Sequence, residues 1–481
     1  MEFPFEIWLH ISRFIPSYEL QGLFCVNHAL FNIAMDKRFK LLRFRRRKDI
    51  ITNITLLQKY KFHSQRVRRL EIWPQIISKI IYDKPISGWK IFHNVITRRI
   101  TEQPSATTQA IAAMINVISE MTDLTDYVHR CWDCNDLPDL ATFSPVVKAG
   151  WAAFGHNLQV LILNVALEGY PYIFSPSLTF PHLEFLGINI SQAYRTTDCS
   201  VIINDLLVPF INNHRISLQS FEVSSYDYLD LNVLFSGLHQ LSNLKKVKID
   251  YRFTSLEQTE TAGLHHFLHI HSPSLQELDL HFRPANDIHI GNPLPCRWFQ
   301  QDFLRVQLPN LQSLDLGMEY FAADLHRTAG YLKQYQNSLT YLSLRSVAFT
   351  LSELSTLLDV FSGTECLRKL DVNVFHLSPE LLDLLEGKVP SLYHLELGFD
   401  RFSSALELAY FPVILESFKQ LSLFCEALHT HKYLDWKLRH LHIHPLGRIL
   451  GDMTKCQVAI SEALPDLETF MLEWSEFELK R

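Results

Sequence analysis

Residues Ser274–Leu280 read SLQELDL, and the same spacing of leucines recurs along most of the chain. Other copies read NLQSLDL from Asn310, CLRKLDV from Cys366 and SLYHLEL from Ser391. Apolar residues that alternate with polar ones are typical of a short strand with one buried face. The first leucines of the eleven clear copies are Leu158, Leu183, Leu218, Leu244, Leu275, Leu311, Leu339, Leu367, Leu392, Leu438 and Leu467. These ten intervals span 309 residues (467 minus 158), a mean of about 31, which predicts a repeat protein.

The stretches between the copies carry helix signals. Thr350 and Glu353 are spaced as a capping box, which favours a helix start. A second helix is predicted after Ser378, with Pro379 at its first position and Gly387 at its end. The longest interval, from residue 392 to residue 438, holds apolar residues at helical spacing over 415–428. We interpret it as a longer helix and not as a missed strand.

A strand followed by a helix, repeated at this period, resembles the leucine-rich repeat family. The resemblance implies an α/β fold, an irregular solenoid of short parallel strands alternating with helices. Weaker copies from Arg66 and Asp123 extend the expected solenoid over residues 67–481. The usual asparagine or cysteine after each strand is missing, its places being taken by Arg283, Glu319, Val347, Phe375 and Asp400. The alternative is a coincidental leucine spacing in an unrelated α/β protein.

The charge of the chain is unevenly distributed. Its 481 residues carry a formal net charge of −6, with 47% hydrophobic and 20% charged residues, as in folded proteins. Residues 37–48, KRFKLLRFRRRK, contain eight basic residues and no acidic one, which leaves 37 basic and 51 acidic residues elsewhere, or −14. This balance argues against nucleic acid as a partner. The basic run itself is interpreted either as the joint between two domains or as a nuclear-import or anion-binding patch.

Cysteine usage and hydropathy indicate an intracellular protein. The eight cysteines are scattered and form no dense disulfide framework, which suits a reducing compartment. No apolar run approaches the ~18 residues that span a bilayer, so no membrane association is expected. Glu2 and Glu6 replace the basic start of a signal peptide, and His10 and Arg13 interrupt any apolar core. We expect a cytoplasmic or nuclear location, or both.

The chain begins with three expected short helices. Pro4 suits the first position of one helix, and Pro16 ends that helix. Ser17 and Asn27 are candidate caps for the second and third helices. These helices carry more apolar residues than one inward face can bury. The excess packs either against the rest of the chain or against a separate protein.

The stretch FPFEIWLHISRFIPSYELQGLFCVNHAL, from Phe3, resembles an F-box over about residues 3–42. It has a start similar to LPxEI, an I-P break and a second helix similar to DLxxLxxVN, with Phe3 and Glu19 replacing the usual Leu and Asp. The resemblance implies docking on a Skp-type adaptor and, through it, on a cullin–RING (SCF) ubiquitin ligase. It assigns the adaptor contacts to Pro4, Ile7, Ile11, Leu20, Leu23 and Val26. The expected domains are an F-box over residues 1–45, a helical linker over 46–66 and the solenoid over 67–481.

The exposed face of the strands is the expected surface for a target protein. In each repeat the leucines point inward, so the alternate residues line the other, concave face. The candidate target-binding residues are Glu277, Asp279, Asp315, Tyr341, Arg345, Asp371, Glu396, His440 and His442. This mixed face suits a protein or peptide better than a small molecule, and its acidic residues favour a basic target. Such charges also occur on any solvated strand face.

Few residues form patterns known from catalysis or metal binding. HLHIH, with His440, His442 and His444 on one strand face, lacks the cysteine or carboxylate that would complete a metal site. HHFLHIHS from His265 has the same deficit, and Cys131 and Cys134 of CWDC have redox-like spacing in a weak repeat. No phosphate loop, dinucleotide fingerprint or hydrolase motif occurs. We therefore expect no catalytic residue, no metal and no cofactor.

Two hypotheses of different classes follow from these patterns. The first is a non-catalytic substrate receptor of an SCF ubiquitin ligase, in which the first helices bind the adaptor and the solenoid binds an unknown target. The second is a leucine-rich-repeat interaction scaffold whose first helices cap the solenoid without any association with a ligase.

Overall fold

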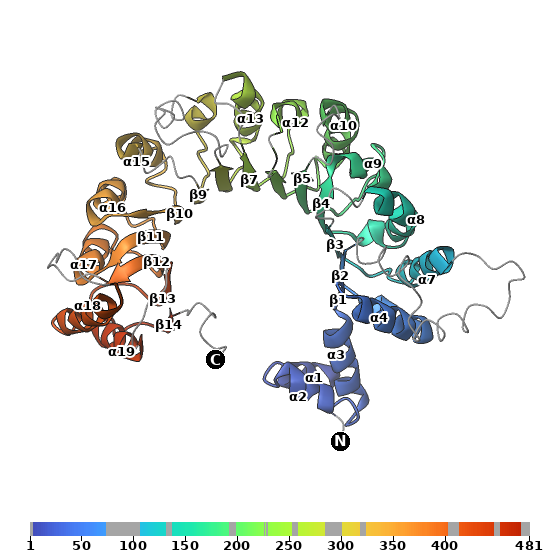
Figure 1. The fold of residues 1–481 in the computed structure, drawn as a ribbon, viewed down its shortest axis with the longest axis horizontal. Helices are drawn as coiled ribbons and strands as arrows, with labels where there is room; N and C mark the ends of the chain where they lie inside the picture. Colours follow the sequence, from blue (N-terminus) through green and yellow to red (C-terminus); the bar gives the residue numbers. More distant parts are fainter. Residues whose placement is uncertain are drawn as a thin grey trace, which may run out of the picture. The chain divides into compact units, whose positions relative to one another are not determined.

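A computed structural model of the chain describes residues 3–73, 106–130, 137–191, 199–225, 227, 229–252, 258–283, 301–317, 324–402, 413–446 and 453–472. The chain forms two compact units. The first comprises Met1–Leu229 and Gly237–Asn243, and the second comprises Asp230–Ser236 and Leu244–Arg481. In each unit the strands lie along one side and the helices along the other (Figure 1).

The first unit begins with three helices and continues as strand–helix repeats. Its helices are α1 (Phe5–Ile11), α2 (Ser17–Gly22), α3 (His28–Phe39), α4 (Arg47–Lys59), α7 (Ala106–Ser119), α8 (Leu137–Phe154), α9 (Tyr170–Ile173), α10 (Cys199–Ile202) and α11 (Val208–Asn213), with the 3-10 helix η1 (Lys61–Arg66) after α4. Its strands are β1 (Leu41–Phe44), β2 (Arg69–Ile72), β3 (Asp126–Arg130), β4 (Val160–Ala166), β5 (Phe185–Ser191) and β6 (Ser220–Ser225). These strands pair in parallel and in chain order.

The second unit repeats the same alternation. Its strands are β7 (Lys246–Arg252), β8 (Glu277–Arg283), β9 (Ser313–Leu316), β10 (Tyr341–Phe349), β11 (Lys369–Leu377), β12 (His394–Phe402), β13 (His440–Pro445) and β14 (Thr469–Leu472). They too are parallel and follow chain order. The helices include α12 (Asn232–Gly237), α13 (Gln258–His271), α15 (Leu325–Lys333), α16 (Leu351–Leu358), α17 (Pro379–Lys388), α18 (Val413–Leu428) and α19 (Met453–Ala463).

The leucines of the sequence pattern form the core of the sheet. The second leucine of a copy pairs with the residue at the same position on the next strand, as Leu278 does with Leu314 and Leu314 with Leu342. Of the eleven first leucines, Leu467 is half-buried and the other ten are at most 1% exposed. The parallel strand–helix repeat is consistent with a leucine-rich-repeat-like solenoid and confirms the predicted α/β class.

Most of the predicted helix signals are found where expected. Thr350 caps α16 in a complete capping box with Glu353, and Ser378 caps α17 with Pro379 at its first turn. The long interval contains α18, as predicted. Gly387 was wrongly predicted as a stop, because α17 continues through it to Lys388 and ends without a left-handed residue.

The three N-terminal helices form, with two corrections to their caps. Asn27 caps α3 as predicted, its side chain accepting a hydrogen bond from the Leu30 N–H at 2.8 Å. Pro16, not Ser17, occupies the cap position of α2, and Pro4 occupies the cap position of α1 and not its first helical position. The chain therefore enters both helices from a proline, whose fixed φ is compatible with a turn before the first helical residue.

The first strand of the sheet precedes the expected start of the solenoid. β1, at residues 41–44, pairs with β2 and lies before both predicted boundaries, at residues 45 and 66. Residues 46–66 are largely helical, and their helices α4 and η1 connect two strands of the same sheet. The weak copies from Arg66 and Asp123 contain β2 and β3.

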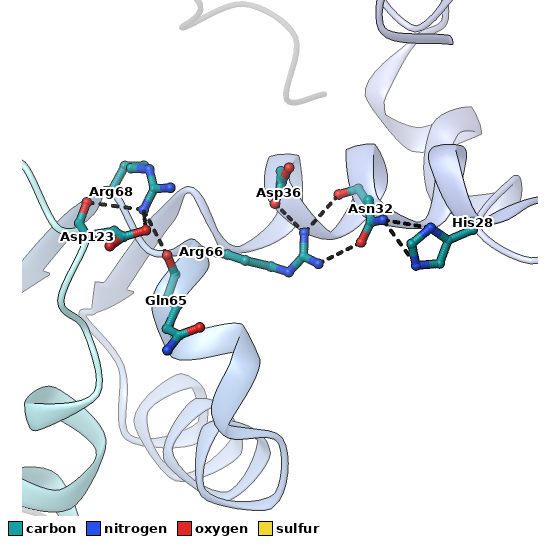
Figure 2. Close-up of polar contacts among 7 residues, drawn as sticks. All are labelled: His28, Asn32, Asp36, Gln65, Arg66, Arg68 and Asp123. Carbon is teal, nitrogen blue, oxygen red and sulfur yellow. Dashed lines mark hydrogen bonds and ion pairs between the residues drawn. The ribbon is translucent and has the colours of Figure 1, made fainter. Parts of the chain in front are cut away.

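Arg66, the last residue of η1, holds α3 against the first repeat (Figure 2). Its guanidinium donates to the Asn32 carbonyl oxygen at 3.2 Å and to Asn32 Oδ1 at 2.7 Å, and it pairs with Asp36. Arg68 donates to the Asp123 carbonyl oxygen at 3.1 Å, ahead of β3. The contacts of Arg66 thus link the N-terminal helices to the first repeat, and that of Arg68 links two successive repeats within the first unit.

The basic run makes contacts on both sides of this joint, within the N-terminal helices and between the first two strands. Lys37 donates to the Ser12 carbonyl oxygen at 3.0 Å, and Arg43 and Arg45 each reach Glu71 at 3.1 Å. Burial opposes ionisation of Glu71, but the neighbouring guanidinium groups, that of Arg43 first, hold its pKa below the usual value. These contacts agree with the joint interpretation of the run, and the import interpretation stays a prediction.

Among the described residues, no helix has the length and apolar character needed to cross a membrane.

Candidate protein-binding surfaces

The N-terminal helices and their connections expose many large apolar side chains. Among the described residues of this segment, the exposed fractions run from 41% at Leu9 to 77% at Phe14. We call the set the N-terminal apolar surface, which comprises Phe3, Phe5, Ile7, Leu9, Phe14, Tyr18, Phe24 and Val26. Single exposed apolar residues are normal, whereas a concentration of them marks an interaction site.

This exposure follows from the small size of the helical core. Leu20, Leu30, Ile33 and Ala34 are buried, with Trp8, Ile15 and Leu23 packed around them. No residue of α1 is buried. Three short helices cannot enclose all their apolar side chains, so the remainder faces outward.

The six residues predicted to bind an adaptor differ in their exposure and fall into three groups. Pro4, Ile7 and Val26 are exposed, and Ile11 and Leu23 are half-buried. Leu20 is only 1% exposed, because it faces α3 from α2 and belongs to the helical core. The sequence left open which of the six residues face the helical core, and the structure places Leu20 there. Six exposed residues that the resemblance did not assign as contacts are Phe3, Phe5, Leu9, Phe14, Tyr18 and Phe24.

The second unit presents rows of mostly polar side chains along its strands. One row is Lys246, Glu277, Ser313, Tyr341, Lys369, His394 and His440. The next row is Lys248, Asp279, Asp315, Ser343, Asp371, Glu396 and His442. We call these two rows, with Arg345 beside them, the strand face of the second unit. It brings together all nine residues predicted to bind a target.

Asp371 differs from the expectation of an exposed strand face. Its side chain is fully buried, and its carboxylate accepts hydrogen bonds from the Tyr341 hydroxyl at 2.5 Å and from Arg345. Arg345 also pairs with Glu396 at 2.9 Å. Burial and the bond to Asp371 raise the pKa of Tyr341. Burial opposes the charge of Arg345, but the same carboxylate raises its pKa. Asp371 therefore organises its neighbours and is not itself at the surface.

The other acidic residues of the strand face are also partly neutralised. Glu277 pairs with Lys246 at 2.8 Å, and Asp315 lies 3.4 Å from the His281 ring nitrogen. Burial, and then the charge of Asp315, raise the pKa of Asp279. Burial opposes protonation of His281, but the bond to Asp315 and its charge raise the pKa of this histidine. The face is therefore less acidic than its composition indicates.

The two predicted histidines have different surroundings. His440 Nδ1 lies 2.7 Å from the Thr469 hydroxyl, toward β14. His442 Nδ1 lies 3.6 Å from Glu396 of β12, and the rings of His442 and His444 are 5.6 Å apart.

Neighbouring strands supply the carboxylate that the HLHIH motif lacks. Two groups among the described residues have all their ligand atoms within 4.8 Å of one another: Glu396 with His442 and His444, and Asp371 with His394 and Glu396. Sequence spacing within one strand could not reveal these groups, because they join residues of different strands. The cysteines of CWDC lie outside the described residues.

Comparisons with known proteins give a fold resemblance and no family. No family model matches this chain, and no curated protein matches its sequence. A chain in a yeast complex of Rad7 and Elc1 aligns with 88% of this chain and 96% of its own length, at 15% identity and a TM-score of 0.42. A Bacteroides fragilis protein aligns with 57% of this chain and 65% of its own, at 14% identity and a TM-score of 0.30.

A third solved structure, TLR13 in complex with ssRNA13, aligns with 84% of this chain and 54% of its own, at 13% identity and a TM-score of 0.29. The chain thus covers less than two thirds of the Bacteroides fragilis and TLR13 chains. At these identities and TM-scores the matches carry no argument about function.

Proposed function

We propose that this chain is a substrate-recognition subunit of an SCF ubiquitin ligase. Its N-terminal helices bind a Skp-type adaptor, and its repeats bind a target protein. The observation that carries the proposal is the N-terminal apolar surface, on a three-helix segment with F-box-like spacing and a small core of its own.

The way in which the segment is attached also supports this role. Arg66 connects α3 to the first repeat through Asn32 and Asp36, while the N-terminal apolar surface stays exposed. A segment that merely capped the solenoid would direct its excess apolar residues into the sheet. Exposed apolar residues on a segment held by polar contacts are better suited to a separate partner.

The proposed mechanism is proximity. A receptor that holds a target beside a ligase raises the effective concentration of the target's lysines and needs no bond chemistry of its own. The strand face of the second unit, with its mixed charges and histidines, is the proposed target surface. Its paired carboxylates favour recognition by shape and hydrogen bonds over simple attraction of a basic segment.

The test measures binding of a purified Skp-type adaptor to the full chain by calorimetry. Val26→Asp and Ile7→Asp change exposed residues and should each weaken binding at least tenfold without lowering the melting temperature. Val201→Asp is the matched control, because Val201 is 51% exposed on α10 and lies outside the N-terminal apolar surface. It should bind as the unaltered chain does.

Leu20→Asp serves as a second control that separates folding from contact. It places a charge in the helical core, so it should unfold the N-terminal helices and abolish binding together. No binding by the unaltered chain would refute the proposal and favour the scaffold without a ligase. Equal binding by Val26→Asp and the unaltered chain would show that the N-terminal apolar surface is not part of the adaptor interface.

A further inference from the structure

The HLHIH strand lies beside a carboxylate from the preceding repeat. In the β12–β13 register, Glu396 is opposite His442, and Gly398 is opposite His444. Successive residues of one face alternate along a strand, so His442 and His444 project on the same side as Glu396. The parallel pairing thus gathers two imidazoles and one carboxylate from two strands.

Gly398 gives the His444 ring its place in this group. A Cβ on Gly398 would lie 2.9 Å from His444 Nε2 and 2.0 Å from Asn373 Oδ1. Any larger residue would displace one of these side chains. Glycine at this position therefore lets the His444 ring extend across β12 toward Glu396.

The donor atoms are close enough to share one metal ion. All three ligand atoms of Glu396, His442 and His444 lie within 4.8 Å of one another, and His442 Nδ1 is 3.6 Å from Glu396 Oε1. In a tetrahedral zinc site with bonds of ~2.0–2.1 Å, donor atoms are about 3.4 Å apart. Small side-chain rotations would close the difference. The side chains of His442 and Glu396 are 16% and 15% exposed, so the group is sheltered but reachable from solvent.

We propose that Glu396 and His442 of the strand face form a Zn²⁺-binding site together with His444. Two imidazole nitrogens and one carboxylate oxygen match the preferences of zinc. Three protein ligands leave at least one coordination position for water or for a donor from a bound molecule. The proposal goes beyond the proposed function and needs neither an adaptor nor a target.

The ion pair between Arg345 and Glu396 competes with metal binding. The Arg345 guanidinium is 2.9 Å from Glu396, so zinc must displace or share that ion pair. Arg345 keeps a second carboxylate in the buried Asp371, and it can therefore release Glu396 without losing every partner.

The overlapping group of Asp371, His394 and Glu396 is a poorer site. Asp371 already accepts hydrogen bonds from Tyr341 and Arg345, and Lys369 lies 3.8 Å away. Two carboxylates with this cationic surrounding would have to give up strong contacts to bind zinc.

The test titrates Zn²⁺ into the metal-free full chain by calorimetry, with and without a competing chelator. We expect one dominant equivalent, weakened at least tenfold by Glu396→Gln, His442→Gln and His444→Gln. His440→Gln is the matched control on the same strand, because His440 contacts Thr469 and lies outside the group; it should change the affinity less than twofold. Melting curves of the metal-free variants confirm that each one folds.

A second measurement replaces zinc with Co²⁺ and records its visible absorption band. An intense band from the unaltered chain, lost in His442→Gln and His444→Gln, supports a low-coordinate site with these ligands. Absence of a zinc equivalent overturns the proposal. An equal loss in His440→Gln also overturns it, and a loss in His394→Gln with His444→Gln unaffected assigns the ion to the other group and overturns it as well.

Discussion

A fall in pH from 7 to 5 should destabilise both units through two histidines buried in the core. His129 of β3 and His271 of α13 are both 0% exposed. Burial lowers the pKa of His129 to about 3 and, against a hydrogen bond to the Phe267 carbonyl, that of His271 to about 4. The Tyr127 hydroxyl lies 2.9 Å from His129 Nδ1, and His271 Nδ1 lies 2.7 Å from the Phe267 oxygen. Both rings are therefore neutral in the folded protein.

The sign of the effect follows from proton linkage. The unfolded chain has an ordinary histidine pKa of 6.5, so it takes up protons below that pH, while the folded chain does not until pH 4 or lower. The stabilisation that depends on these two neutral rings is therefore fully present above pH 6.5. It is lost as the pH falls toward the folded-state pKa values of the two histidines. At pH 5, protonation of the unfolded state costs about 2 kcal/mol of folding free energy for each histidine.

The assay is urea unfolding of the full chain at pH 7 and pH 5. His129→Gln and His271→Gln do not titrate in this range, so each should show a pH-dependent loss about 2 kcal/mol smaller than the unaltered chain. His156→Gln is the control, because His156 is exposed, and it should match the unaltered chain. The reasoning is refuted if both core variants keep the full pH dependence, since the buried rings would then be protonated in the folded state.

Two further predictions concern the second unit. Arg345→Leu removes the guanidinium that binds the buried Asp371 carboxylate and should lower the free energy of unfolding by about 1–3 kcal/mol, because Asp371 keeps the Tyr341 hydroxyl; adding Asp371→Asn should restore much of the loss, and an equal urea midpoint for Arg345→Leu and the unaltered chain would contradict this role. Thr350→Ala breaks the capping box of α16 and should cost about 1 kcal/mol in the same assay. Thr356→Ala in the same helix should cost less than about 0.5 kcal/mol, and equal losses for the two threonine variants would show that the cap does not matter.

Local patterns predicted the repeats well. A leucine at alternate strand positions, such as Leu278 or Leu314, has one way to be buried in a parallel ladder, and both are buried. The caps at Asn27 and Thr350 were equally predictable from the sequence. Each side chain accepts a hydrogen bond from the N–H three residues ahead, so the signal lies within one helical turn. The prediction that α17 stops at Gly387 was wrong because a glycine inside a helix costs only about 1 kcal/mol. Packing of the neighbouring leucines outweighs this cost.

Exposure was harder to predict than periodicity. Leu20 and Val26 both belong to the F-box-like pattern, yet Leu20 is buried against α3 and Val26 is 61% exposed. Helical spacing groups residues on faces, but it does not say which face meets a neighbouring helix. Charge was similarly ambiguous, since Asp371 occupies a position typical of a solvated strand face and is nevertheless buried beneath Arg345.

The amino-acid sequence alone determined the alternation of strand and helix, the leucine core and the three helices at the start, because each depends on side chains a few residues apart. Tertiary structure decided which apolar residues remain exposed at the N-terminus and which carboxylate stands beside His442 and His444. Glu396 and His442 are separated by 46 residues (442 minus 396) but are opposite each other in the β12–β13 register. That register is set by how successive leucines pack in the core, and no local pattern encodes the polar neighbours that it brings together.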